Sequence, residues 1–146
     1  MNGPFRFSVR TRVEFADTDA AGVLYYGRYP RYIDQAVIAY RRHIGIDLLG
    51  PPGHLYVVRA LDLRYHAAAF FDDALEIFAR VARIGRTSHT IRVRVERDRD
   101  GDRTHLADGE VVVVGLDRYE GRPSAMPGAL RDRIREFEGD RLEDVA

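Results

Sequence analysis

The sequence contains neither cysteine nor lysine among its 146 residues. Without cysteine the chain has no disulfide bonds, no thiolate ligands for a metal ion and no cysteine nucleophile. Without lysine it can form neither a Schiff base with a substrate nor the lysine contact of a P-loop. Its 23 basic residues are therefore all arginines.

The sequence also has no excess of positive or negative charge, since its 23 arginines are balanced by 23 aspartates and glutamates. A net charge of zero argues against binding of nucleic acid or a membrane surface through the overall electrostatic field. No stretch approaches the ~18 apolar residues of a membrane span, and residues 1–12 lack the apolar segment of a signal peptide. We therefore expect a cytoplasmic protein with neither a membrane nor a nucleic acid as partner.

Length and composition predict one domain that spans residues 1–146. Chains of this size bury roughly 68–70% of their unfolded surface, which suffices for a sizeable core. A hydrophobic content of 45% with 32% charged residues is typical of globular proteins. The polar tail from Glu138 to Ala146 is expected to fray.

Hydrophobic periodicity predicts one strand and one long helix in the first third of the chain. Apolar and polar side chains alternate from Phe5 to Phe15, as in a half-buried strand. Small and acidic residues follow at 16–22 and predict a loop. From Arg28 to Ile44 the apolar positions recur with helical spacing. Pro30 in the first turn and Gly45 after the last turn suit the two ends of a helix.

The rest of the chain predicts four successive strands and a short helix. Alternating or β-branched segments fill much of residues 61–114, with turn signals at Asp72-Asp73, Gly85-Arg86 and Asp100-Gly101. A short amphipathic helix is expected at Pro127–Phe137. This order predicts an α+β fold in which a five-stranded antiparallel sheet wraps around one long central helix.

The candidate active site lies in the loop before the long helix, at Asp17-Thr18-Asp19. A bare pair of acids is often only a solvated turn. The same pattern occurs in metal-dependent sugar transferases, but no nucleotide-binding motif or further ligand cluster accompanies it here. A carboxylate beside a helix N-terminus, with its unpaired N–H groups and partial positive charge, can perform acyl transfer. Tyr26 lies where the helix begins, so its backbone N–H is a candidate donor to an oxyanion.

Two further places are candidates for substrate binding. Asp34, inside the helix, is either an ordinary surface carboxylate or a group that reaches a substrate lying along the helix. Arg86 and Thr87 lie at a strand junction, where an arginine can bind a phosphate in bidentate fashion. The five histidines show no metal-ligand spacing such as H-x-x-x-H, and we expect neither a metal ion nor a cofactor.

A family resemblance lies in residues 13–26, VEFADTDAAGVLYY, and in the helix residues Tyr29, Tyr32, Ile33 and Asp34. These residues resemble the hotdog-fold acyl-CoA thioesterases, and most closely the 4-hydroxybenzoyl-CoA thioesterase family, which includes the Tol-Pal-associated acyl-CoA thioesterases. The likeness covers nearly the whole chain. Its most specific part is a motif in which two acids flank any one residue and are followed by two small residues and a glycine, with aromatic residues where the helix starts. It implies an enzyme that hydrolyses an acyl-CoA thioester to free acid and CoA.

The resemblance also implies a role for each candidate residue. In that family the second acid of the motif, here Asp19, attacks the thioester or activates water. The helix-end N–H that polarises the thioester carbonyl falls on Tyr26, and the aspartate that helps to place a 4-hydroxyaryl group falls on Asp34. The basic cluster for the CoA nucleotide falls on Arg86, Thr87 and the glycine before them. Members that act on aliphatic acyl groups often have histidine at the position of Tyr26, so this chain is more similar to the aryl type.

The resemblance implies a homo-oligomer, either a dimer or a homotetramer, with sites between subunits. Two other function classes stay open. One is a hotdog hydratase or dehydratase, which would act on an enoyl-CoA. The other is a non-catalytic module that binds acyl-CoA without releasing a thiol. The choice between CoA and acyl carrier protein stays open as well.

Overall fold

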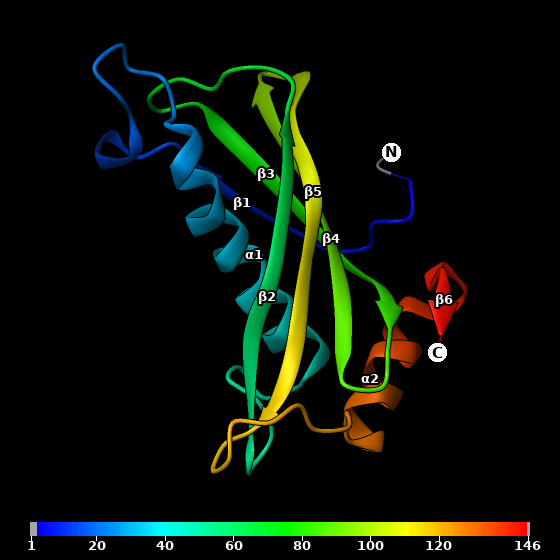
Figure 1. Ribbon diagram of the computed structural model, residues 1–146. Helices are drawn as coiled ribbons and strands as arrows, with labels where there is room; N and C mark the ends of the chain where they lie inside the picture. Colours follow the sequence, from blue (N-terminus) through cyan, green and yellow to red (C-terminus); the bar gives the residue numbers. More distant parts are fainter. Residues whose placement is uncertain (1–2, 146) are drawn as a thin grey trace.

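One antiparallel sheet and one long helix form most of the structure, a computed structural model that describes residues 3–145. The strands are β1 (Ser8–Arg12), β2 (His54–Tyr65), β3 (Ala74–Ile84), β4 (Ser88–Arg99), β5 (Asp102–Asp117) and β6 (Asp144–Val145). The sheet order is β1-β3-β4-β5-β2, and β6 adds in parallel to the end of β3. Figure 1 shows the sheet beside the long helix α1 (Tyr29–Ile44). The predicted hotdog arrangement, five antiparallel strands around one long helix, is confirmed.

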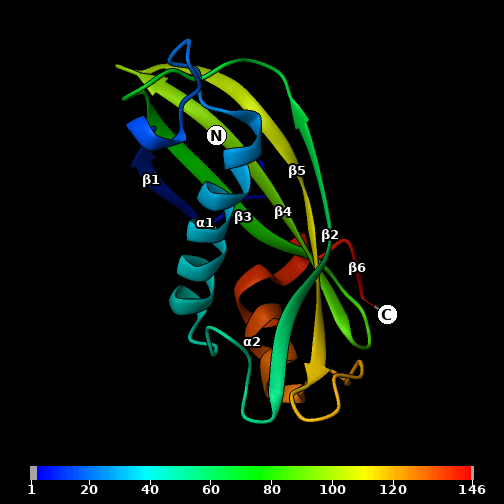
Figure 2. The ribbon, with the colours of Figure 1, turned by 60° about the vertical axis from the view of Figure 1, so that its left-hand side comes forward.

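Helix α1 presents one apolar stripe to the concave face of the sheet (Figure 2). Its buried apolar side chains recur at helical spacing: Tyr29, Tyr32, Ile33, Ala36, Val37, Tyr40 and Ile44. They pack against buried, largely β-branched residues of β3, β4 and β5. Gly45 ends the helix in the left-handed conformation at φ 77°, which costs a glycine little. The helix is therefore held mainly by packing against the sheet.

The start of α1 differs from the expectation. A separate 3₁₀ turn, η2 (Tyr26–Arg28), precedes it, and no side chain caps either segment. Another 3₁₀ turn, η1 (Phe15–Asp17), follows β1. The predicted hairpin turn at Asp100-Gly101 is confirmed, with φ values of 53° and 91°. Both lie in the left-handed region that a tight two-residue turn requires.

The C-terminal segment corrects the expectation of a frayed tail from Glu138 onward. Helix α2 (Gly128–Glu138) is followed by the 3₁₀ turn η3 (Gly139–Arg141) and by β6. Glu138 is fully buried and accepts hydrogen bonds from the Tyr40 hydroxyl at 2.6 Å and the Val81 N–H at 3.0 Å. The polar composition gave no sign of this packing. The buried Glu138 carboxylate links the segment to α1 and β3, and the Glu143 N–H adds a hydrogen bond to the Ala82 carbonyl at 2.8 Å. Ala146 lies outside the described residues.

The edge strand β2 carries apolar side chains that are exposed to solvent in the single chain. Val57, Val58, Leu61 and Tyr65 are 38%, 55%, 42% and 47% exposed. One edge of β2 pairs with β5, and its other edge has no partner strand within residues 3–145. The same residues include no helix that is long and apolar enough to cross a membrane.

Candidate active site

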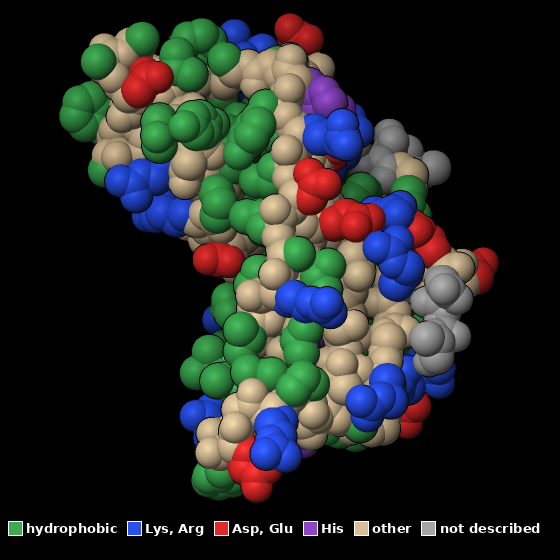
Figure 3. All heavy atoms as spheres, in the orientation of Figure 1, with side chains coloured by type: hydrophobic (Ala, Val, Ile, Leu, Met, Phe, Trp, Pro, Cys, Tyr) green, Lys and Arg blue, Asp and Glu red, His purple; other side chains and the backbone are tan. Residues whose placement is uncertain are grey.

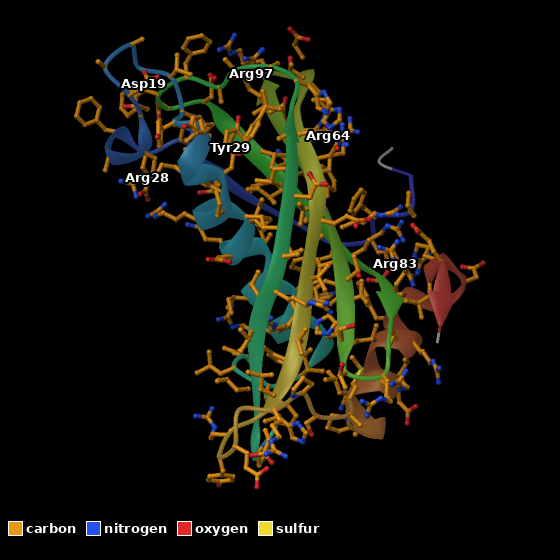
Figure 4. All side chains as sticks on the ribbon, viewed as in Figure 1. Asp19, Arg28, Tyr29, Arg64, Arg83 and Arg97 are labelled. Carbon is orange, nitrogen blue, oxygen red and sulfur yellow. The ribbon has the colours of Figure 1, made fainter. Side chains whose placement is uncertain are left out.

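The acidic motif sits on a small hairpin between β1 and η2. Tyr25 N–H donates to the Asp17 carbonyl at 3.0 Å, Thr18 and Leu24 form a bridge, and Asp19 N–H donates to the Val23 carbonyl at 2.8 Å. This pairing fixes both acids in front of the N-terminal end of α1. Figure 4 labels Asp19 in this loop, and Arg28 and Tyr29 where α1 begins.

Asp17 is the buried acid of the pair, with 4% of its surface exposed. Its Oδ2 accepts hydrogen bonds from the Tyr32 hydroxyl at 2.5 Å and from Arg31 at 3.1 Å. Burial, above all, and the Asp17 carboxylate raise the pKa of Tyr32 to about 12, so the hydroxyl stays protonated and donates. Through these contacts the Asp17 carboxylate joins the hairpin to α1.

Asp19 is the exposed acid, and one of its oxygens is held by the loop. Oδ1 accepts the Ala21 N–H at 2.9 Å and the Val23 N–H at 3.1 Å. Within residues 3–145, no hydrogen bond to Oδ2 is found. The backbone thus orients the carboxylate while one oxygen stays available to a substrate or a water molecule.

The 3₁₀ turn η2 carries open backbone donors at the base of the same hairpin. Arg28 N–H already donates to the Tyr25 carbonyl at 2.9 Å. The N–H groups of Tyr26 and Gly27 come earlier in the turn and have no acceptor within it. Asp19 is two hairpin residues beyond Asp17, roughly 7 Å at 3.3 Å per residue. Tyr26 directly follows Tyr25, which pairs with Asp17, so the hairpin carries the Asp19 carboxylate near its tip and the open donors at its base.

Tyr65, at the end of β2, is a residue of this region that the sequence analysis missed. Its hydroxyl donates to the Tyr26 carbonyl at 3.0 Å, and its ring packs against Tyr29 with centroids 5.0 Å apart. The contact connects the edge strand to the helix start. A tyrosine in an alternating strand gave no signal beyond an ordinary apolar position.

Asp34 lies further along α1 and lines an open groove of about 260 Å³ between the helix and β2. Eight positions separate it from Tyr26, about 12 Å at 1.5 Å per residue. The other lining residues are mostly apolar: Val37, Ile38, Arg41, Tyr56, Val57, Val58, Val111 and Val113. Figure 3 shows the surface hollowed on this side. Partial burial raises the pKa of the Asp34 carboxyl, and Arg41 opposes that shift.

Arg86 and Thr87 lie far from the acidic hairpin of the same chain. The start of β3 adjoins that hairpin, because Phe71 N–H donates to the Gly22 carbonyl at 2.9 Å. The eleven residues of β3 then rise through roughly 35 Å before the turn with Arg86 and Thr87 is reached. Arg86 is exposed. One copy of the chain therefore does not bring these two residues to Asp19 and Tyr26.

Comparisons with known proteins agree with this architecture. A family model described as the thioesterase superfamily matches residues 21–104. A curated relative, the acyl-CoA thioester hydrolase YbgC of Escherichia coli O6:H1, is 32% identical over 128 residues, 86% of this chain and 92% of the relative. A solved thioesterase superfamily structure from a Jannaschia species has a TM-score of 0.85 and 23% identity, and the match covers 97% of this chain and 87% of that one. The 4-hydroxybenzoyl-CoA thioesterase of a Pseudomonas species has a TM-score of 0.78 and 23% identity, covering 87% and 97% of the two chains.

Proposed function

This chain belongs to the thioesterase superfamily and is a thioester hydrolase, and we propose that it hydrolyses acyl-CoA thioesters with Asp19 as the reactive carboxylate. One observation carries the proposal. The loop holds Oδ1 of Asp19 through two N–H groups and leaves Oδ2 open, on the hairpin that leads directly into the turn before α1. Arrangements of this kind combine a base or nucleophile with an oxyanion donor.

In the proposed reaction the thioester carbonyl oxygen accepts the Tyr26 N–H, and the positive end of the helix favours the negative charge that develops there. By one route, Asp19 attacks the carbonyl carbon, the C–S bond breaks and the CoA thiolate leaves. Water then cleaves the resulting anhydride. By the other route, Asp19 takes a proton from water as the water oxygen attacks the same carbon. Both routes end in a free acid and CoA, and in both a thiolate leaves without the help of a metal.

We place the acyl group in the groove between α1 and β2. Its lining is mostly apolar and includes the Asp34 carboxylate. A carboxylate there can accept a hydrogen bond from a donor on the acyl group, such as a phenol hydroxyl. This supports an aryl substrate of the 4-hydroxybenzoyl type, in line with the family resemblance.

We further propose that the working protein is a homo-oligomer, a dimer or tetramer, and that a second copy supplies Arg86 and Thr87. The exposed apolar side chains on the unpaired edge strand β2 support this assembly. The separation of roughly 35 Å along β3 supports it independently, because a CoA phosphate held by Arg86 needs a site built from two chains. Residence in the cytoplasm stays a prediction, which fractionation of the source cells tests.

A thiol-release screen over aryl and aliphatic CoA esters tests the proposal. We expect release of free CoA from at least one class, with the hydroxyaryl ester turned over best. Parallel assays with an acyl carrier protein thioester and an enoyl-CoA separate the remaining alternatives. Tight binding of CoA esters without thiol release would identify a binding module, and hydration of the enoyl-CoA without thiol release would identify a hydratase.

A further inference from the structure

A cluster of two histidines and one aspartate lies on the outer face of the sheet, outside the proposed active site. His66 follows the last residue of β2, and His105 and Asp108 belong to β5. Asp108 Oδ2 is 3.1 Å from His66 Nε2 and 2.8 Å from His105 Nε2, and one ligand atom from each residue lies within 4.8 Å of the others. The two imidazole rings are 4.6 Å apart.

A β-bulge builds this cluster. In a regular strand, residues three positions apart point to opposite faces. Between β4 and β5 the register shifts: Val95 pairs with Ala107 and Glu96 with His105, so Leu106 is an extra residue. The extra residue turns His105 to the same face as Asp108.

The neighbouring strand brings the third side chain to that face. Arg64 of β2 lies directly opposite Asp108, and His66 is two residues further along the same side of the strand. Figure 4 labels Arg64 on this stretch. Gly109 makes the close pairing possible, because a Cβ there would lie 1.9 Å from the Asp62 carbonyl oxygen. The backbone thus fixes all three side chains from two adjacent strands.

We propose that His66, His105 and Asp108 bind a divalent transition-metal ion, with Zn²⁺ as the best fit. Imidazole nitrogens with one carboxylate oxygen form a donor set that Zn²⁺ favours. With metal–ligand bonds of about 2.1 Å, tetrahedral ligand atoms lie about 3.4 Å apart. Both measured contacts to Asp108 fall within 0.6 Å of that value.

The present contacts leave one ligand atom without a well-aligned partner and all three side chains partly open to solvent. His105 Nε2 is buried and has no well-aligned hydrogen-bond partner, so it gains a partner when it ligates a metal. The three side chains are 43%, 28% and 39% exposed, in the order His66, His105 and Asp108. An ion can therefore enter from solvent, and a water molecule can fill the fourth position.

Calorimetric titration of the tag-free, EDTA-treated and dialysed protein with Zn²⁺ tests the inference. We expect one equivalent per chain, with a dissociation constant in the micromolar range or below. Replacement by Co²⁺ should give the visible absorption of a tetrahedral site. His66→Gln and Asp108→Asn should each weaken binding at least tenfold.

Two control variants each remove a side chain of the same type, a histidine or an aspartate, that lies outside the cluster. His43→Gln replaces a histidine on α1, and Asp72→Asn an exposed aspartate in the loop before β3. Both should bind the metal within twofold of the parent. The absence of stoichiometric binding below 100 μM, or equal affinity in the parent and both cluster variants, would overturn the site. Far-UV circular dichroism checks that each variant is folded, and the outcome does not depend on the proposed thioesterase activity.

Discussion

Lowering the pH should destabilise the protein through His89, a buried histidine on β4. Only 4% of its surface is exposed, and its ring lies 5.9 Å from the ring of Tyr56. Burial, and secondarily the charge of Arg41, lowers the pKa of His89 from 6.5 to about 4. The cationic form is disfavoured on both counts, since it would lose hydration and face another cation.

The sign and size of the effect follow from linkage. A histidine whose pKa is lower in the folded than in the unfolded state stabilises the fold fully above pH 6.5. This contribution is lost as the pH falls toward 4, because the unfolded chain takes up the proton first. At about 1.4 kcal/mol for each pKa unit, His89 accounts for a loss of roughly 2.5 kcal/mol between pH 7.5 and pH 4.5.

Urea unfolding at a series of pH values measures this contribution when the parent is compared with His89→Gln. Glutamine does not titrate, so the variant should lose about 2.5 kcal/mol less unfolding free energy over that range. Carboxylates with lowered pKa, such as Asp73 and Glu96, titrate in both proteins and cancel in the difference. Identical pH dependence in the two proteins would refute the reasoning.

Three further predictions concern the substrate and the assembly. Asp34→Ala should reduce kcat/KM for a hydroxyaryl-CoA ester by roughly tenfold to a hundredfold and leave the unsubstituted aryl ester nearly unaffected, since a hydrogen bond to a charged group contributes about 1.5–3 kcal/mol. Equal losses on both esters would make Asp34 structural. Arg86→Ala should raise KM for CoA esters with kcat nearly unchanged, and added salt should shrink the effect; an unchanged KM would return Arg86 to the solvated surface. Light scattering at micromolar concentration should show a dimer or tetramer that Val58→Glu dissociates, whereas a monomeric parent would contradict the two-chain site.

The elements with strong periodicity could be predicted from the sequence. Helix α1 has seven buried apolar residues on one face and a glycine at its end, so the hydrophobic spacing and the terminating residue both predict the same helix. The Asp100-Gly101 turn was also predictable, because both of its positions need a left-handed backbone, which few residue types other than glycine, asparagine and aspartate adopt. The acidic motif before α1 also marked the hairpin on which the loop N–H groups hold one oxygen of the exposed Asp19.

Features that depend on tertiary context could not be predicted. The burial of Glu138 needs Tyr40 and the Val81 N–H, which come from distant parts of the chain. The convergence of His66, His105 and Asp108 depends on a single bulge, and sequence spacing carries no sign of it. The distance of Arg86 from the acidic hairpin follows from the path of β3 and is likewise not contained in a local motif.

Turnover by Asp19→Asn tests the central claim most directly. Asparagine keeps an Oδ1 that can accept the Ala21 and Val23 N–H groups, so the loop should hold its shape while charge and nucleophilicity are lost. Asp72→Asn serves as a matched control, because it removes an exposed carboxylate at the same end of the molecule. The account predicts that thiol release falls at least about a hundredfold in Asp19→Asn, stays near the parent rate in Asp72→Asn, and falls less in folded Asp17→Asn. A larger loss in Asp17→Asn than in Asp19→Asn, or an Asp19→Asn rate close to that of the parent, would contradict it.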